Sequence, residues 1–278
     1  MINRIHQMYW LSGEVRTDDR NITFENPPVY EVIRLMEGVP LFFEAHMERL
    51  EHSLELVGYP SDFHKKDYYE AIRKLVESTG IVNNNVRLEV GKTENGMDHS
   101  VLYYVKSSYP SAIEYQTGVD VMTAEVVREN PHAKVFYEEY VNMITEMREN
   151  EQVYEVLLHN SEGVLTEGSK SNLFFIKDGV LVSAKSETIL MGITRDKLLG
   201  ILDDLKIDVI EMDIHKNELA SFDACFISGT SIHILPIRKI NDITYASSEN
   251  RIIKEMTDAF KGVVVQDIQN TRRLYHNG

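Results

Sequence analysis

The chain has 278 residues, 43% of them hydrophobic, and its 44 acidic residues outnumber its 29 lysines and arginines, giving a formal net charge of −15. This length fits one large domain or two moderate ones, each with a full core. The acidic balance argues against a nucleic-acid partner, which usually needs a basic face.

The cysteine count, the lengths of the apolar stretches and the spacing of the histidines argue against several further classes of protein. The single cysteine rules out an internal disulfide and fits a reducing cytoplasm. No apolar stretch approaches membrane-spanning length, and the N-terminus carries no signal-peptide pattern. The histidines lack the spacing of metal ligands. We therefore expect a cytoplasmic protein with neither a metal site nor a membrane partner.

The first part of the chain predicts a small domain of strands and helices. Apolar residues recur at helical spacing over 44–57, and Gly58 and Pro60 follow as helix-ending residues. Two alternating segments flank Asn95-Gly96, which is typical of a β-hairpin. The predicted elements are strands at 29–35, 86–90 and 101–105 and helices at 44–57 and 64–78.

The second part predicts a larger domain of mixed strands and helices. Residues 107–115 begin with Ser-Ser-Tyr-Pro-Ser and form the best candidate for a linker. We accordingly expect an N-terminal α/β domain over 1–110 and a C-terminal α/β domain over 116–278. The predicted elements are strands at 119–127, 153–159, 163–165 and 173–176 and helices at 137–150 and 192–205.

Lys134 and Glu167 are the residues that suggest a chemistry. A lysine can form a Schiff base with an aldehyde cofactor, and a carboxylate can keep that cofactor's ring nitrogen protonated. Glu167 stands in a Thr-Glu-Gly-Ser-Lys-Ser-Asn run (166–172) that leads from a turn into a predicted strand. An acid at such a strand end is well placed to point into a cleft.

The run at 166–172 resembles the class IV aminotransferases, which are pyridoxal-phosphate enzymes of fold type IV. That family includes branched-chain aminotransferases, D-amino acid aminotransferases and aminodeoxychorismate lyases. The resemblance covers almost the whole chain and is strongest over 154–195. It implies two α/β domains with the cofactor cleft between them, a barrel-like sheet in the larger domain, a homodimer and pyridoxal 5'-phosphate as cofactor. It also implies that Lys134 bonds the cofactor and moves the substrate proton.

The resemblance further implies where the cofactor's phosphate and ring are held. His-Met-Glu-Arg-Leu (46–50) matches a family motif whose arginine grips the phosphate, and an arginine fork suits two oxygens at once. Gly-Ile-Thr-Arg (192–195) opens a predicted helix, where backbone amides favour an anion. The residues implied at the phosphate are Arg49, Ile193, Thr194, Thr230 and Ser231, and Leu190 is implied to pack on the ring.

Two positions near these motifs depart from the family. The family commonly has Lys-x-x-Asn-Tyr, whereas Val-Phe-Tyr follows Lys134 here. Tyr137 or Tyr140 could hydrogen-bond the cofactor's phenolic oxygen, or could merely pack. Lys170 stands where small residues are usual.

Substrate recognition is harder to predict. Tyr30 matches an aromatic residue that lines the family's substrate pocket. Arg87 matches an arginine that helps hold a substrate carboxylate in branched-chain enzymes, although a surface arginine on a strand fits the pattern equally well. The Arg-x-His pair of D-amino acid aminotransferases is missing after Gly91, and Pro27-Pro28 replaces a usual glycine turn, so this loop must have another shape.

The predicted function is pyridoxal-phosphate-dependent transfer of an amino group between a small α-amino acid, with a branched-chain substrate slightly favoured, and a 2-oxo acid. Two alternatives stay open. One is a lyase of the aminodeoxychorismate type, which uses the same cofactor and lysine. The other is a non-catalytic relative that binds a ligand in the cleft.

Overall fold

The structure is a computed structural model that describes residues 4–18, 22–59, 64–93, 98–128 and 130–275. Its contacts divide the chain into two compact units. The first unit comprises residues 1–108, 133–137 and 264–278, and the second comprises 109–132 and 138–263. None of the described helices combines the length and the apolar character that a membrane span requires.

The first unit is built on a six-stranded sheet in which every pairing is antiparallel, in the order β2-β1-β6-β5-β3-β4. The predicted hairpin of β5 and β6 is confirmed by their pairing, while its Asn-Gly turn lies outside the described residues. The strands are β1 (Arg4–Leu11), β2 (Glu14–Arg16), β3 (Val29–Met36), β4 (Val39–Pro40), β5 (Asn84–Lys92) and β6 (Asp98–Val105).

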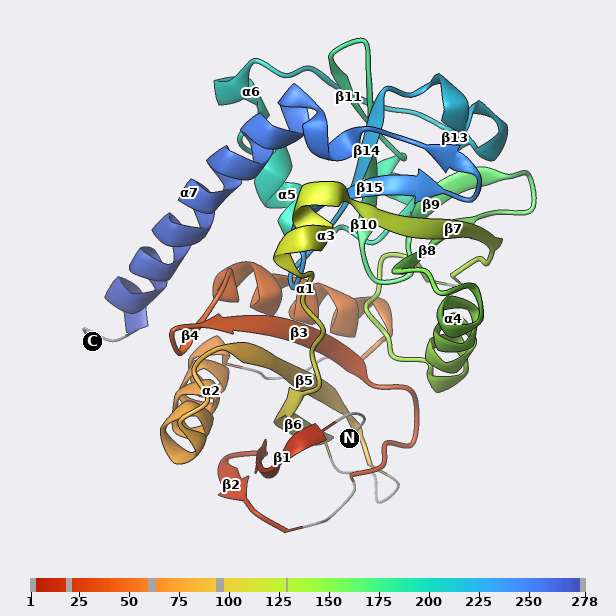
Figure 1. Cartoon of the computed structure of the whole chain (residues 1–278). Helices are drawn as coiled ribbons and strands as arrows, with labels where there is room; N and C mark the ends of the chain where they lie inside the picture. The colour runs from red at the N-terminus through yellow and green to blue at the C-terminus, as the bar shows by residue number, and fades with distance from the viewer. Residues whose placement is uncertain (1–3, 19–21, 60–63, 94–97, 129, 276–278) are drawn as a thin grey trace. The chain divides into compact units, whose positions relative to one another are not determined.

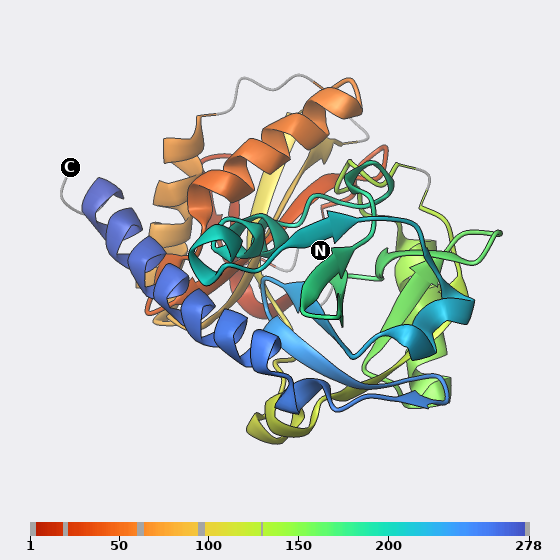
Figure 2. The same cartoon turned by 90° about the horizontal axis from the view of Figure 1, so that it is seen from above.

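Helices α1 (Phe43–Leu56) and α2 (Lys65–Thr79) cover one face of this sheet (Figures 1 and 2). Both were predicted from helical spacing, and both are confirmed within two residues at each end. Their apolar stripes pack on alternate residues of β3, β5 and β6 to form the core of the unit. The opposite face of the sheet carries aromatic residues and the charged pair of Arg87 and Glu89.

The second unit is built on a ten-stranded mixed sheet, in which β7 pairs in parallel with β8 and β15. The strands are β7 (Val119–Glu125), β8 (Glu155–His159), β9 (Val164–Gly168), β10 (Asn172–Lys177), β11 (Val180–Ser183), β12 (Val209–Glu211), β13 (Ile214–His215), β14 (Ala224–Gly229), β15 (His233–Ile240) and β16 (Ile243–Thr244).

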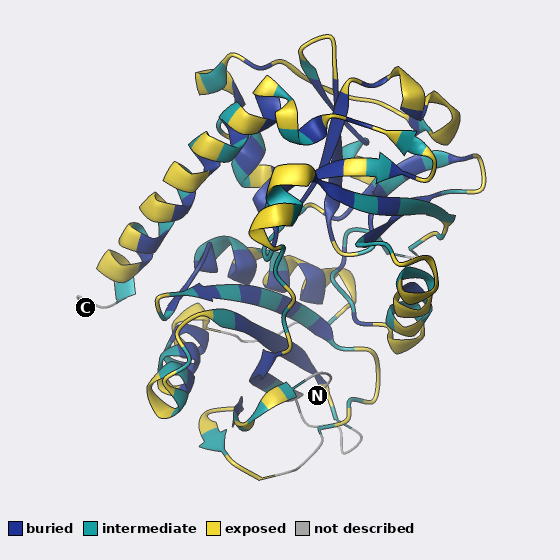
Figure 3. Ribbon diagram, viewed as in Figure 1, coloured by how far each residue is buried: buried dark blue, intermediate teal, exposed yellow. Residues whose placement is uncertain are grey.

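The helices of the second unit are mostly short or exposed. Helix α4 buries only Ile144 (Figure 3). The α-helices that begin in this unit are α3 (Ala112–Thr117), α4 (Glu138–Glu151), α5 (Ile193–Leu199), α6 (Leu202–Leu205) and α7 (Arg251–Tyr275). The 3-10 helices are Ser186–Thr188, Lys216–Ser221 and Ser247–Glu249.

Two sequence predictions differ from this architecture. The single helix predicted over 192–205 is wrong, because α5 stops before Gly200, a poor helix former, and α6 starts afterwards. The predicted C-terminal domain also included residues 133–137 and 264–278, which the contacts assign to the first unit. Val135 bridges Val29 of β3, and Tyr275 stacks on Tyr69 of α2, with ring centroids 4.1 Å apart.

Candidate active site

Lys134 is held in the first unit by its own backbone. Its carbonyl accepts a hydrogen bond from the Tyr30 N–H at 3.0 Å, and its N–H donates to Ser53 Oγ at 3.2 Å. These contacts fix a short segment against β3 and α1, far along the chain from either element. The Lys134 Nζ lies 4.9 Å from the centroid of the Tyr30 ring. Two predicted site residues are therefore neighbours.

Arg87 is the third predicted residue in this part of the first unit. Its guanidinium carbon lies 4.1 Å from the Tyr30 ring centroid and 4.3 Å from that of Phe136. Its Nε donates to Glu89 Oε1 at 2.7 Å, and both side chains are buried. Arg87 is therefore not the surface arginine that the sequence left as an alternative. Lys134 and Arg87 lie beside the same aromatic ring.

Arg49, the predicted phosphate ligand, pairs with a carboxylate that the sequence did not suggest. Its Nε and Nη2 donate to the two oxygens of Glu31, each at 2.7 Å. Glu31 also contacts His46 Nδ1 at 2.7 Å and is completely buried. A guanidinium held in this two-point manner has a fixed orientation. Its role at the phosphate stays a prediction.

The pKa values of Glu31 and His46 both lie below their ordinary values. Burial raises the pKa of Glu31, but the charges and hydrogen bonds of Arg49 and His46 outweigh it and lower the pKa overall. Burial lowers the pKa of His46, and this effect exceeds the opposing effect of Glu31. In both groups, the unfolded chain binds protons more readily than the folded one.

We expect the free energy of unfolding to fall on acidification because of these two groups. A lowered folded pKa gives stability that is present above the unfolded pKa and is lost as the pH falls. With ordinary pKa values of 6.5 and 4.5, the stabilising contribution of His46 should be lost as the pH falls below about 6.5, and that of Glu31 as it falls below about 4.5. The free energy of unfolding can be measured by urea titration at several pH values between 7 and 5. Its decrease with falling pH should be smaller for His46→Gln than for wild type.

At pH 7, Glu31→Gln should lower the free energy of unfolding by roughly 3 kcal/mol, since it leaves Arg49 without its charged partner. Glu51→Gln on the exposed side of α1 serves as the control. If the free energy of unfolding of His46→Gln fell with pH as steeply as that of wild type, His46 would not be a source of this pH dependence.

Glu167 lies in the second unit and is only 3% exposed. Arg128 Nη1 donates to its Oε1 at 2.8 Å, and the Leu190 backbone N–H donates to its Oε2 at 3.1 Å. The carboxylate is therefore held at both oxygens. The sequence prediction missed Arg128, although it stands six residues before Lys134. Its only local signal was a charged residue in a Pro-containing loop.

The residues that follow Glu167 form a tight turn. A side chain on Gly168 would meet Ser171 Oγ at 2.1 Å, and one on Gly192 would meet Asn172 Oδ1 at 1.9 Å. Asn172 in turn donates to the Leu190 carbonyl at 2.9 Å. A Cβ at either glycine would therefore displace the side chain of Ser171 or Asn172. This turn therefore joins the Glu167 run to the segment that carries Leu190, Ile193 and Thr194.

The predicted phosphate residues of the second unit lie at two chain turns. Ile193 and Thr194 start α5, whose first amides have no acceptor within the helix. Thr230 and Ser231 form the connection between β14 and β15. The buried hydroxyls of Thr194 and Ser228 have no hydrogen-bond partner within the described part of the chain. Such hydroxyls suit a phosphate, which accepts several hydrogen bonds.

The two candidate tyrosines differ in their surroundings. Tyr137 is 42% exposed. The Tyr140 hydroxyl donates to the Ser169 carbonyl at 3.0 Å, directly beside the Glu167 run. This contact favours Tyr140 over Tyr137 as a neighbour of the cofactor's ring, and the contribution of either stays a prediction.

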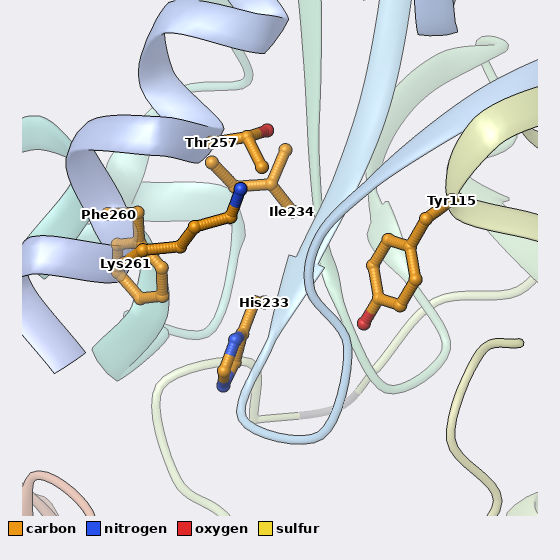
Figure 4. A pocket seen from close by; sticks show the side chains of 6 residues that line it. All are labelled: Tyr115, His233, Ile234, Thr257, Phe260 and Lys261. Atoms are coloured by element: carbon orange, nitrogen blue, oxygen red, sulfur yellow. The ribbon is translucent and has the colours of Figure 1, made fainter. Parts of the chain in front are cut away.

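A cavity of about 330 Å³ lies behind the β14–β15 turn (Figure 4). The Tyr115 hydroxyl donates to the Ile232 carbonyl at 2.9 Å and thereby supports this turn. The cavity is lined by Tyr115, His233, Ile234, Thr257, Phe260 and Lys261. No group of three or more metal-binding side chains exists among the described residues.

Comparisons with known proteins show which family this sequence matches. Residues 28–240 match the family described as amino-transferase class IV. A D-alanine aminotransferase of Listeria monocytogenes is 31% identical over 248 residues, which cover 84% of this chain and 85% of the relative. The branched-chain-amino-acid aminotransferase of Escherichia coli strain K12 is 24% identical over 290 residues, covering 94% of each.

The fold is also similar to that of a solved branched-chain aminotransferase from Thermoproteus uzoniensis, described with norvaline. The TM-score is 0.83 at 22% identity, and 96% of this chain and 97% of the other are covered. This likeness confirms the predicted α/β fold of type IV. Since the family match spans well over half of the sequence, the chain belongs to the class IV aminotransferases and is an aminotransferase.

Proposed function

We propose that the protein transfers an amino group between a small apolar α-amino acid and a 2-oxo acid, with pyridoxal 5'-phosphate as cofactor. The main support for this proposal is the environment of Glu167. Its carboxylate is buried in the family's signature turn and accepts a hydrogen bond at each oxygen. Such a carboxylate is preorganised to face a cationic ring nitrogen without moving. When bound, the cofactor supplies an electron sink for the substrate's α-carbon.

The donor groups of the second unit suit this cofactor. Thr194 and Ser228 offer buried hydroxyls that find no acceptor among the described residues. The amides at the start of α5 add donors for an anion. In the proposed arrangement, Ile193, Thr194, Thr230 and Ser231 hold the phosphate, and Leu190 packs on the ring.

The residues of the first unit would act on the substrate. Lys134 holds and moves the proton at the substrate α-carbon through its Nζ. Tyr30 forms an aromatic wall beside that amine. Arg87 offers a buried guanidinium for a carboxylate, and Arg49 contributes to the phosphate. The curated relatives act on either D-alanine or branched-chain amino acids by name, so a small apolar side chain is common to both.

The experiment that tests the proposal is trapping followed by a substrate panel. The purified protein is loaded with pyridoxal 5'-phosphate and reduced with borohydride, and the labelled peptide is identified by mass spectrometry. We expect the label on Lys134. Loss of visible absorbance on adding single L- and D-amino acids then identifies the donors. A protein that takes up no cofactor contradicts the proposal, and release of 4-aminobenzoate and pyruvate from aminodeoxychorismate would identify a lyase instead.

We also propose a cytoplasmic homodimer, as the resemblance implies. Light scattering on the loaded protein tests the assembly, and a mass of one chain would contradict it.

A further inference from the structure

Glu155 is a completely buried carboxylate to which the proposed function assigns no role. It begins β8 and lies beside the turn that follows Glu167. Its Oε1 accepts hydrogen bonds from Ser169 Oγ at 2.5 Å and from the Val156 N–H at 2.9 Å. Its Oε2 accepts from Ser171 Oγ at 3.3 Å. Glu155 therefore bonds two side chains of the turn that leads away from Glu167.

Ser169 is the residue through which Glu155 holds this turn. The Ser169 N–H donates to a backbone carbonyl of β8 at 2.8 Å, and its carbonyl accepts from the Tyr140 hydroxyl at 3.0 Å. Those two contacts belong to the backbone, whereas the contact with Glu155 is made by the side chain. Since Glu167 stands only two residues earlier, at the end of β9, a shift of Ser169 would move Glu167 with it.

The charge of Glu155 distinguishes it from a neutral acceptor such as a glutamine. Burying an ionised group is costly unless hydrogen bonds and nearby charges offset the cost. Hydrogen bonds to a carboxylate are, however, shorter and stronger than those between neutral groups. The Ser169 hydroxyl is therefore held more firmly than a neutral acceptor would hold it.

Lys170 is a cation that acts on this carboxylate. Its Nζ lies 5.8 Å from the centroid of the ring of Tyr154, the residue directly before Glu155. Partial removal from water lowers the pKa of Lys170, and the negative charge of Glu155 opposes this shift. The two charged side chains therefore attract each other, and Lys170 offsets part of the cost of burying Glu155. This attraction gives a reason for a lysine where the family usually has a small residue.

We propose that Glu155 is a positioning residue for amino transfer. It holds Ser169, and Ser169 in turn keeps the Glu167 carboxylate aimed at the cofactor's ring nitrogen. The inference rests on the proposed function, because it takes Glu167 as the partner of that nitrogen. It extends the function by naming the group that fixes where this carboxylate points.

Two variants test the proposal from either end of the same hydrogen bond. Glu155→Gln keeps the size of the side chain and removes its charge, and Ser169→Ala removes the donor at a half-buried position. In each, kcat should fall about tenfold while KM stays within about twofold, because a misplaced group weakens transition-state stabilisation and not substrate binding. The dissociation constant of pyridoxal 5'-phosphate, measured by fluorescence titration, should rise about threefold.

The matched control is Thr145→Val. Thr145 lies on α4, the helix of Tyr140, and its exposed hydroxyl bonds only within that helix, to the Val141 carbonyl at 2.7 Å. Loss of this hydroxyl should leave kcat and the affinity for cofactor unchanged. Thermal melts of all variants show what fraction of each is folded at the assay temperature.

A double-mutant cycle separates positioning from a general loss of stability. If Glu155 acts through Glu167, then adding Glu155→Gln to Glu167→Gln should lower kcat by less than about twofold more, whereas independent defects would multiply. Because Ser169→Ala tests the same bond, the cycle can be run with it alone if Glu155→Gln does not fold.

Two results would overturn the inference. One is a folded Ser169→Ala enzyme that keeps the kcat and the cofactor affinity of wild type. The other is a loss of kcat that is as large in the Glu167→Gln background as in wild type. Amino transfer by wild type, with a loss of kcat in Glu167→Gln, leaves the proposed function standing in both cases. A wild-type protein that takes up no cofactor would instead remove the proposed function itself.

Discussion

Replacing Lys134 by alanine should lower the rate of amino transfer by about 10³-fold or more. The variant loses both the covalent anchor for the cofactor and the base that moves the α-proton. Its backbone contacts with Tyr30 and Ser53 do not involve the side chain, so the fold should be retained. Stopped-flow absorbance with a single amino donor measures the half-reaction directly.

The control for this variant is Lys177→Ala. Lys177 ends β10 and contacts Ser221 at an exposed position, so its loss should leave the rate within about twofold. Cofactor should still bind Lys134→Ala without a covalent bond, since the phosphate residues lie elsewhere in the chain. A Lys134→Ala enzyme that transfers amino groups within tenfold of wild type would contradict the role assigned to this lysine.

Changing Glu167 to glutamine should lower the rate by roughly 10²-fold. The amide has the size of the carboxylate and can still accept from the Leu190 N–H, but it cannot balance a cationic ring nitrogen. We therefore expect the affinity for cofactor to fall as well. Fluorescence titration of the protein with pyridoxal 5'-phosphate measures this effect independently of turnover.

Arg128 provides the matched comparison. Glu167→Gln leaves the Arg128 guanidinium without its charged partner, so part of any loss could come from a disturbed loop. Arg128→Met combined with Glu167→Gln removes both charges. The double variant should regain thermal stability relative to the single one without regaining activity. Recovery of activity in the double variant would show that the loop, and not the ring nitrogen, explains the loss.

Local patterns in the sequence were sufficient to predict many of the helices and strands. The stripe of α1 repeats every three to four residues, and β5 and β6 alternate, so both types of element could be predicted from a short window. Glu167 could be found because its run combines an acid, two turn residues and a strand. Each of these signals lies within about ten residues of the chain.

Partners that are distant in sequence could not be predicted in this way. Glu48 and Glu51 neighbour Arg49 on its own helix, yet its partner Glu31 stands 18 residues earlier on β3. Arg128 and Glu167 are 39 residues apart. Helix α7 is not among the predicted elements, although it is the longest described helix. Pairing across a fold depends on topology, which a single sequence with short-range patterns does not determine.

Helix α7 has a consequence for how the protein is made. Its later residues belong to the first unit, where Asp267 accepts the N–H of Phe42 at 2.6 Å and Arg272 pairs with Glu37. Ribosomes deliver the chain from its N-terminus, and early domains usually fold as they emerge. Here the first unit is completed only after α7, which follows the residues of the second unit in the chain, has left the exit tunnel. Until then, Phe43 and Tyr69 lack the Tyr275 ring that contacts them in the folded unit, so this part of the core is completed late in synthesis.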